Sequence, residues 1–250
     1  MIYYLQYIIL GTLQGIFEWL PISSEGVVSL VSNIFKIGVN AVDFSLFLHL
    51  GTLLAVGIYF WHDFIDLLLV KDKKFFKFFV LVTIISLAVG LLVYKFAREL
   101  NIGNGLLTLM GLALIATAFF QKQGRKFNLS DNQLAVIVGL LQGFSAIPGL
   151  SRSGSTIFGL SLKENDPEKV LKTSFIISAP VVFASSAYLL LFGDKVLFSS
   201  GTLVSVLFSF LVGLASLKIL LAWAKKINFF WFALIFGILC LAGGALELLL

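Results

Sequence analysis

Six stretches of the chain are apolar over a length that suits a membrane-crossing helix, and this pattern limits the available folds more than any other feature. They lie at roughly 43–61, 75–94, 104–121, 171–192, 198–222 and 229–249. A helix of about 20 apolar residues crosses the hydrocarbon core of a bilayer. Backbone polar groups find no water there, so each span must pair them within itself. The pattern predicts an all-α polytopic membrane protein with about six full spans.

Composition leaves little room for a soluble domain. Hydrophobic residues make up 59% of the 250 residues and charged residues only 12%, with a mean hydropathy of +1.04. A soluble domain of this length needs far more charge to cover its surface. We therefore expect a single membrane domain over residues 1–250, multi-pass in the cell (inner or plasma) membrane. No feature suggests a nucleic-acid partner.

Two further regions, 1–36 and 133–163, are apolar but interrupted by glycine, proline and serine. Such breaks leave backbone groups unpaired, which is tolerated only inside the protein or beside a water-filled cavity. Each region is therefore predicted to be a re-entrant hairpin, a helix–loop–helix unit that enters and leaves on one side of the membrane.

Basic residues are unevenly distributed among the loops. Twelve of the 18 lysines and arginines fall in four loops, and only four lie on the opposite side. The four loops lie near 62–77, 121–132, 163–172 and 223–228. Cytoplasmic loops are typically enriched in lysine and arginine, so these loops are predicted to face inward. Region 133–163 then starts and ends on the inner side, and region 1–36 enters from the outer side.

The two hairpin regions also resemble each other in sequence. At an offset of 128 residues, LGTLQGIFEWLPISSEG (10–26) and VGLLQGFSAIPGLSRSG (138–154) share six identities. Gly11, Leu13, Gln14, Gly15, Ser23 and Gly26 align with Gly139, Leu141, Gln142, Gly143, Ser151 and Gly154. We favour an inverted repeat, with repeat 1 at about 1–121 and repeat 2 at about 133–250, because interrupted helices at corresponding positions point to a midplane site. The alternative is that two glycine-rich helices resemble each other by composition alone.

The first hairpin places an acid in an apolar setting. Gln14 and Glu18 are four residues apart and share one face of a helix. An ionisable residue at membrane depth costs about 2.5–3.5 kcal/mol and needs a partner or water. The run Ser23-Ser24-Glu25-Gly26 follows and is typical of an anion-binding loop at a helix start. The alternative is that Glu18 ends an interfacial helix, with its carboxylate reaching the headgroup region.

The second hairpin carries the complementary charge. The run PGLSRSGST (148–156) surrounds Arg152 with the hydroxyls of Ser151, Ser153, Ser155 and Thr156. A guanidinium matches phosphate oxygens in bidentate geometry. Residues after Gly154 would start a helix whose positive end points at the anion. The alternative is that Arg152 neutralises Glu18 in a buried pair and the hydroxyls only fill helix contacts.

Together the two loops predict a site for a phosphate ester within the membrane, so the natural substrate is a lipid phosphate. The carboxylates could hold Mg²⁺ or Ca²⁺ through oxygen ligands or act as a general base. Ser24 is a nucleophile only with such activation.

At this point the residues resemble a known family. The pairing of QGIFEWLPISSEG with PGLSRSGST, and the segment HLGTLLAVGIYF at 49–60, are similar to the undecaprenyl-diphosphate phosphatases, also called bacitracin-resistance proteins. The resemblance covers essentially the whole chain in order and spacing. It implies divalent-metal dependence and an inverted repeat with re-entrant hairpins.

Residue chemistry and the resemblance together imply a set of site residues. The family's acidic motif falls on Gln14 and Glu18, and Ser24 is the second of its paired serines. The implied catalytic residues are Glu18, Ser24, Arg152 and Glu25. Substrate binding is assigned to Gln14, Ser23, Ser151, Ser153, Gly154 and Thr156, and Glu18 is the expected metal ligand.

One departure from the family pattern concerns Val27, where a histidine usually serves as proton donor or base. Glu25 occupies a position that is usually small and polar, and we predict that it supplies the missing acid or base. His49 is interpreted as a packed or interfacial residue. Both His49 and His62 are too distant along the chain to be assigned to the site.

The resemblance implies hydrolysis of a polyprenyl (undecaprenyl) diphosphate to the monophosphate and inorganic phosphate, which recycles the carrier lipid of the cell envelope. A polyprenyl-phosphate transporter or flippase would suit a midplane anion site equally well, and a structural membrane subunit is a third alternative. The expected partners are the polyprenyl diphosphate lipid and the membrane. The sequence leaves a homodimer open.

Overall fold

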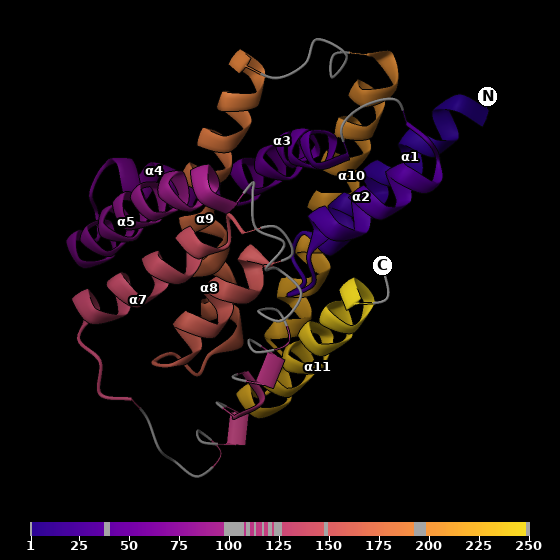
Figure 1. Cartoon of the computed structure of the whole chain (residues 1–250). Coiled ribbons are helices and arrows are strands. Elements are labelled where there is room, and N and C mark those ends of the chain that lie inside the picture. The colour runs from indigo at the N-terminus through magenta and orange to yellow at the C-terminus, as the bar shows by residue number, and fades with distance from the viewer. Residues whose placement is uncertain are drawn as a thin grey trace.

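The computed structural model describes residues 2–37, 41–97, 108, 111–112, 114–116, 118–119, 122, 127–147, 150–192 and 199–248. Every regular element within these residues is a helix (Figure 1). The first five are α1 (Ile2–Phe17), α2 (Ser24–Ile34), α3 (Ala41–Tyr59), α4 (Trp61–Leu68) and α5 (Lys73–Ala97). The others are α7 (Asp131–Phe144), α8 (Arg152–Ser161), α9 (Pro167–Phe192), α10 (Ser200–Ala224) and α11 (Phe229–Leu248).

Five of the predicted spans coincide with helices, namely α3, α5, α9, α10 and α11. Segments of α5, α9 and α10 are long and apolar enough to cross a membrane, over Lys73–Val93, Pro167–Leu189 and Ser200–Ala224. The pair α3 and α4 meets the same criterion but bends by 75° at its junction. Most of the predicted span 104–121 lies outside the described residues. The chain is therefore an all-helical protein with membrane-spanning helices in the part that is described.

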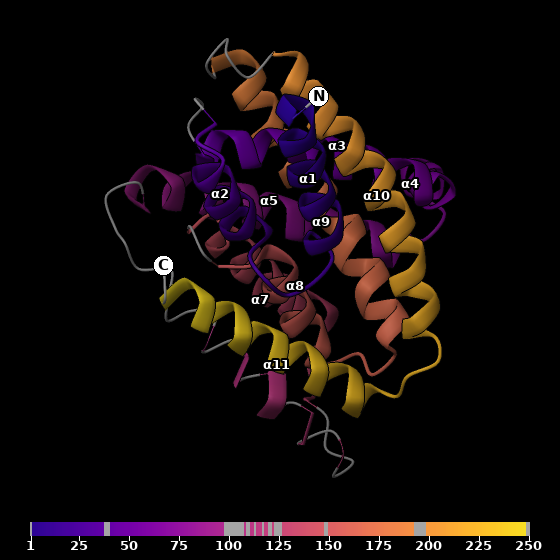
Figure 2. The ribbon, with the colours of Figure 1, turned by 90° about the vertical axis from the view of Figure 1, so that its right-hand side faces the viewer.

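Both interrupted regions fold as a helix, a turn and a second helix, as predicted. In the first, α1 packs against α2 and along α10; in the second, α7 packs against α8 and along α5 (Figures 1 and 2). The aligned glycines Gly15 and Gly143 lie at these contacts. A Cβ atom on Gly15 would lie 2.7 Å from the backbone nitrogen of Gly213, and one on Gly143 would lie 2.6 Å from Cβ of Val89. Both glycines therefore permit a close approach of helices.

The described parts of the four basic loops lie together at one end of the bundle, where ion pairs join them. These pairs are Lys172–Asp63 (2.6 Å), Lys163–Asp131 (2.5 Å) and Lys225–Glu168 (3.2 Å). The Lys163 ammonium also holds the pKa of Asp131 below its usual range. Loops that the charge distribution assigns to one side of a membrane thus lie together in the structure.

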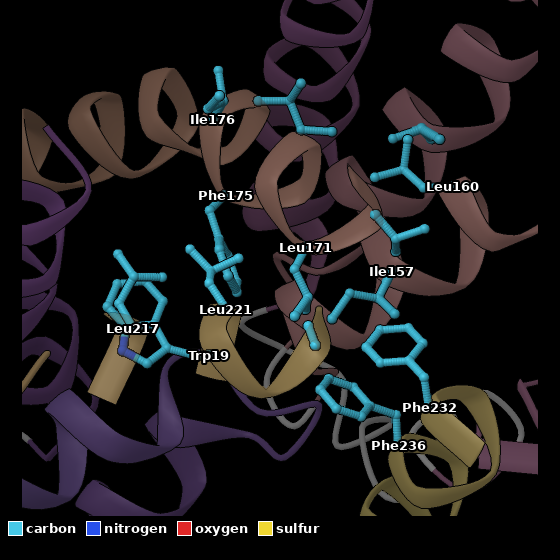
Figure 3. Close-up of a cluster of buried hydrophobic side chains, with 14 of the residues drawn as sticks. Trp19, Ile157, Leu160, Leu171, Phe175, Ile176, Leu217, Leu221, Phe232 and Phe236 are labelled. Atoms are coloured by element: carbon cyan, nitrogen blue, oxygen red, sulfur yellow. The ribbon is translucent and has the colours of Figure 1, made fainter. Parts of the chain in front are cut away.

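A core of buried apolar side chains lies beside the tip of the first hairpin (Figure 3). Trp19 is 2% exposed, and its indole N–H donates to the carbonyl of Gly213 at 3.0 Å. Its ring meets Phe175 of α9 edge-on, with 5.1 Å between centroids. Trp19 follows Glu18 directly, so this packing fixes the backbone that carries the acid.

Candidate functional site

The turns of the two hairpins meet in the middle of the molecule. The Ser153 hydroxyl, in the first turn of α8, donates to the carbonyl of Leu20 at 2.7 Å. Arg152, the first residue of α8, forms an ion pair with Glu18, which directly follows α1. The hairpins approach from different parts of the bundle (Figure 1). Because these contacts join their turns, the two turns form one site.

Aligned serines begin the second helix of each hairpin. Ser23 caps α2 by accepting from the amide of Gly26 at 3.1 Å, and Ser151 caps α8 by accepting from the amide of Gly154 at 3.2 Å. A serine hydroxyl at this position satisfies an amide that the helix leaves unpaired. The cap at Ser151 explains why α8 begins at Arg152 and not after Gly154 as predicted. The repeated sequence thus produces the same local structure twice.

Glu18 is the centre of the site. Its side chain is 2% exposed, and three donors and a histidine nitrogen surround its carboxylate. Gln14 Nε2 (2.8 Å), Ser24 Oγ (2.9 Å) and His49 Nε2 (3.1 Å) contact Oε2, and Arg152 Nη2 contacts Oε1. A carboxylate that accepts from Gln14, Ser24 and Arg152 is ionised. The interfacial interpretation of Glu18 is therefore wrong, and the predicted pairing with Arg152 is confirmed.

A cavity of about 230 Å³ opens beside this carboxylate. Its polar walls include Glu18, Ser23, Ser24, Glu25, Asp43, His49, Ser151, Arg152 and Ser153. Its apolar walls include Ile22, Leu46, Leu150, Val181 and Val182. Charged groups beside aliphatic walls suit an amphiphile with a polar head and an apolar tail.

Three of the expected binding residues lie behind the cavity wall. Gln14 is fully buried and reaches the site through Glu18. The Gly154 amide is bound by the Ser151 cap. The hydroxyl of Thr156 lies 2.6 Å from that of Ser174 on α9. These residues shape the turns that carry the lining groups.

Arg152 retains a donor for an anion. Its Nη2 contacts Glu18, whereas its Nη1 is buried and has no hydrogen-bond partner among the described residues. A buried guanidinium N–H without a partner is costly, and Arg152 lines the cavity. The N-terminus of α8, which carries partial positive charge, starts at this residue. Arg152 therefore offers an unpaired cationic donor at the cavity.

The sequence predicts Glu18 as the ligand of a divalent cation, but the surroundings of its carboxylate do not favour that role. Both oxygens of this carboxylate are already engaged by donors, so a cation would have to displace one of them. Within the described residues, no three histidine, cysteine, aspartate or glutamate side chains are grouped to hold a metal. Glu25 and Asp43 are the other carboxylates of the cavity. Mg²⁺ is commonly held by one or two carboxylates together with substrate phosphates, and these two residues fit that pattern.

Comparison with known proteins identifies the family. Residues 7–242 match the family model described as bacitracin resistance protein BacA. This chain belongs to the BacA family. A relative from Methanothrix thermoacetophila, named undecaprenyl-diphosphatase, is 33% identical, with 97% of this chain and 98% of the relative covered. Relatives of the same name from Methanococcoides burtonii and Thermosipho africanus are 35% and 36% identical, over 93% and 90% of this chain and 95% and 94% of their own length.

In this BacA-family chain the imidazole at the site comes from α3, which sequence reasoning missed. His49 is bound to Glu18 through Nε2 and lines the cavity, whereas Val27 of α2 is not part of the lining. His49, which the sequence led us to interpret as a packed or interfacial residue, therefore lies at the site. The one signal in the sequence that pointed to His49 was its place in the segment HLGTLLAVGIYF. Its contact with Glu18 joins α3 to the turn after α1, and no local pattern predicts a contact between such distant segments.

Proposed function

We propose that the chain hydrolyses undecaprenyl diphosphate to undecaprenyl monophosphate and inorganic phosphate inside the membrane, recycling the carrier lipid of the cell envelope. The observation that carries this proposal is the convergence of Ser24 and Arg152 on Glu18 at the wall of a partly apolar cavity. The family and the names of the relatives support it. These relatives are named as hydrolases, and the comparisons give no support to the transporter alternative.

Binding of the head group falls to the second hairpin. Arg152 lines the cavity and its Nη1 has no hydrogen-bond partner among the described residues, and guanidinium–phosphate pairs are strong and directional. Ser151 and Ser153 line the same wall, and their hydroxyls, which contact each other and the Leu20 carbonyl, would turn towards the phosphate when it binds. The prenyl chain would leave along Leu46 and Val182, which belong to the apolar wall. The diphosphate is thereby held with its terminal phosphorus towards the first hairpin.

The first hairpin supplies the nucleophile. The Ser24 hydroxyl donates to Glu18 at 2.9 Å, so Glu18 acts as its general base. The Ser24 oxygen forms a bond to the terminal phosphorus while the bond from that phosphorus to the bridging oxygen breaks. The monophosphate leaves with the electron pair, and the hydroxyl proton passes to Glu18. Water then attacks the phosphorus of the phosphoserine while the bond to the Ser24 oxygen breaks, that oxygen takes back the proton from Glu18, and inorganic phosphate carries the atoms of the water molecule away.

A Mg²⁺ or Ca²⁺ ion would be held by Glu25 and Asp43 together with phosphate oxygens. The ion would neutralise the negative charge of the diphosphate. This arrangement leaves Glu18 available to Ser24. It gives Glu25 a role in metal binding in addition to its predicted role as acid or base.

The membrane topology that we propose has six full spans and two re-entrant hairpins of opposite orientation, related as an inverted repeat of about 1–121 and 133–250. The ion-paired basic loops at one end support a cytoplasmic assignment for that end. The equivalent caps at Ser23 and Ser151 support the repeat. We assign the protein to the cell membrane on the same grounds.

Phosphate release from undecaprenyl diphosphate by the purified protein in detergent, with Mg²⁺ or Ca²⁺, tests the activity. We expect Ser24→Ala and Arg152→Ala to lose at least about 100-fold in kcat/KM, the scale of a lost catalytic group. Ser200→Ala is the matched control, since Ser200 lies at the exposed start of α10. Release at the same rate by wild type and Ser24→Ala would contradict the mechanism, and no release by wild type would contradict the function.

A further inference from the structure

His49 is a polar group at the site to which the proposed attack of Ser24 and the proposed hydrolysis of the phosphoserine assign no role. It lies on α3, lines the cavity with a side chain that is 13% exposed, and contacts the same oxygen of Glu18 as Ser24 does. Its Nδ1 is 2.9 Å from the carbonyl of Ser45, one turn earlier on α3. Both ring nitrogens are therefore held, and the ring has one orientation.

The partners of the ring define its protons. The Ser45 carbonyl only accepts, so Nδ1 carries a hydrogen. The Glu18 carboxylate accepts from all its other neighbours, so Nε2 also carries a hydrogen. The imidazole thus lies at the cavity wall with a proton on Nε2, which contacts Glu18. An ion pair with Glu18 compensates its charge.

We infer that His49 is a further catalytic residue, the one that gives a proton to the departing monophosphate and later takes a proton from water. The inference rests on the proposed hydrolysis. When the bond between the terminal phosphorus and the bridging oxygen breaks, that oxygen takes the Nε2 proton, and Glu18 has taken the proton of Ser24. In the second half, neutral His49 accepts a proton from water as it attacks the phosphoserine, and Glu18 returns its proton to Ser24. Charges and protons balance over the cycle.

The surroundings of the ring suit this exchange. The charged groups that face it are Glu18 after α1, Glu25 on α2, Asp43 on α3 and Arg152 on α8, all lining the same cavity. Oxygen Oε2 of Glu18 touches both Ser24 and His49, so the residue that accepts the serine proton lies beside the one that donates to the leaving group. A histidine placed only for packing would not line the cavity and contact the carboxylate that receives the Ser24 proton.

The variant His49→Gln separates the contact of the ring with Glu18 from its role in proton transfer. A glutamine amide donates to Glu18 and preserves the neutral contact, but it transfers no proton. Loss of general acid–base catalysis typically costs about 10²–10⁴-fold, so we expect His49→Gln to lose at least about 100-fold in kcat with KM and thermal unfolding temperature nearly unchanged. The matched control is His62→Gln on α4, because His62 is exposed and does not line the cavity. We expect it to behave as wild type.

Chemical rescue provides the second measurement. We expect added imidazole to raise the kcat of His49→Ala at least about tenfold, and not to affect His62→Ala. Retention of activity by His49→Gln within about threefold of wild type overturns the inference. So does a large loss in His49→Gln with no rescue of His49→Ala, because that result assigns the ring a structural role. An inactive wild-type protein contradicts the proposed hydrolysis itself, so the two failures are distinguishable.

Discussion

Arg152 and Glu18 form a largely buried ion pair across 134 residues of chain. The pair joins the first residue of α8 to the residue that follows α1, so it holds the two hairpin turns together. It also leaves Nη1 of Arg152 available to an anion. One contact therefore has a structural role and a functional one, and substitutions can separate them.

Removal of one partner of the Arg152–Glu18 ion pair should destabilise the protein more than removal of both partners. Arg152→Met takes the guanidinium from the Glu18 carboxylate and leaves it with Gln14, Ser24 and His49, and the loss of one partner of a buried ion pair typically costs about 3–5 kcal/mol. The double variant Arg152→Met/Glu18→Gln should recover most of that loss, yet neither should release phosphate. Thermal unfolding in detergent and phosphate release measure the two effects. Equal unfolding temperatures for the single and double variants would contradict the coupling.

Helix packing at Gly15 and Gly143 should tolerate no methyl group. A Cβ at either position would meet a backbone or branched side-chain atom at 2.7 or 2.6 Å, and overpacking of this kind costs about 1–3 kcal/mol. Gly15→Ala and Gly143→Ala should each lower the unfolding temperature. Gly57→Ala is the matched control, because a Cβ there meets nothing within 4 Å. Equal effects at all three positions would show that the contacts do not limit stability.

The Mg²⁺ requirement of phosphate release should change when Glu25 or Asp43 is replaced. Chelation with EDTA should abolish phosphate release. Glu25→Gln and Asp43→Asn should each raise the Mg²⁺ concentration for half-maximal rate by about tenfold or more, since even outer groups of a metal site change affinity by about 10–100-fold. The measurement is a Mg²⁺ titration of initial rates at saturating lipid. Unchanged titration curves would assign the ion to other groups.

The surface pair between Lys163 and Asp131 should contribute little to stability. Its side chains are 36% and 63% exposed, and exposed pairs contribute about 0–1 kcal/mol. Because the pKa of Asp131 is lowered in the folded state, the contribution is present above the usual aspartate pKa and is lost as the pH falls through the lowered value. Lys163→Gln should therefore lower the unfolding temperature slightly at neutral pH and not in acid. A difference that persists in acid and in high salt would contradict this.

Sequence patterns predicted the helices of the described part well, because bilayer length, hydropathy and helix breakers act locally. Breaks at Pro21 and in the serine-rich runs mark the turns of both hairpins, and aligned Ser23 and Ser151 make equivalent caps. The predicted start of α8 was three residues late, because a capping hydroxyl decides where a helix begins and several serines were available. The predicted inverted repeat and the roles of the site residues stay predictions.

By itself, the sequence determined a helical membrane protein with two polar turns, a carboxylate in one and a guanidinium in the other, since these follow from residue type and spacing along one element. Only the tertiary structure decided which groups share a cavity. It brought His49 to Glu18 from a different helix, left Val27 outside the lining, and turned Thr156 towards Ser174. The physical reason is that contacts between helices depend on packing of whole faces, as at Gly15 against α10, and no local pattern encodes which face meets which.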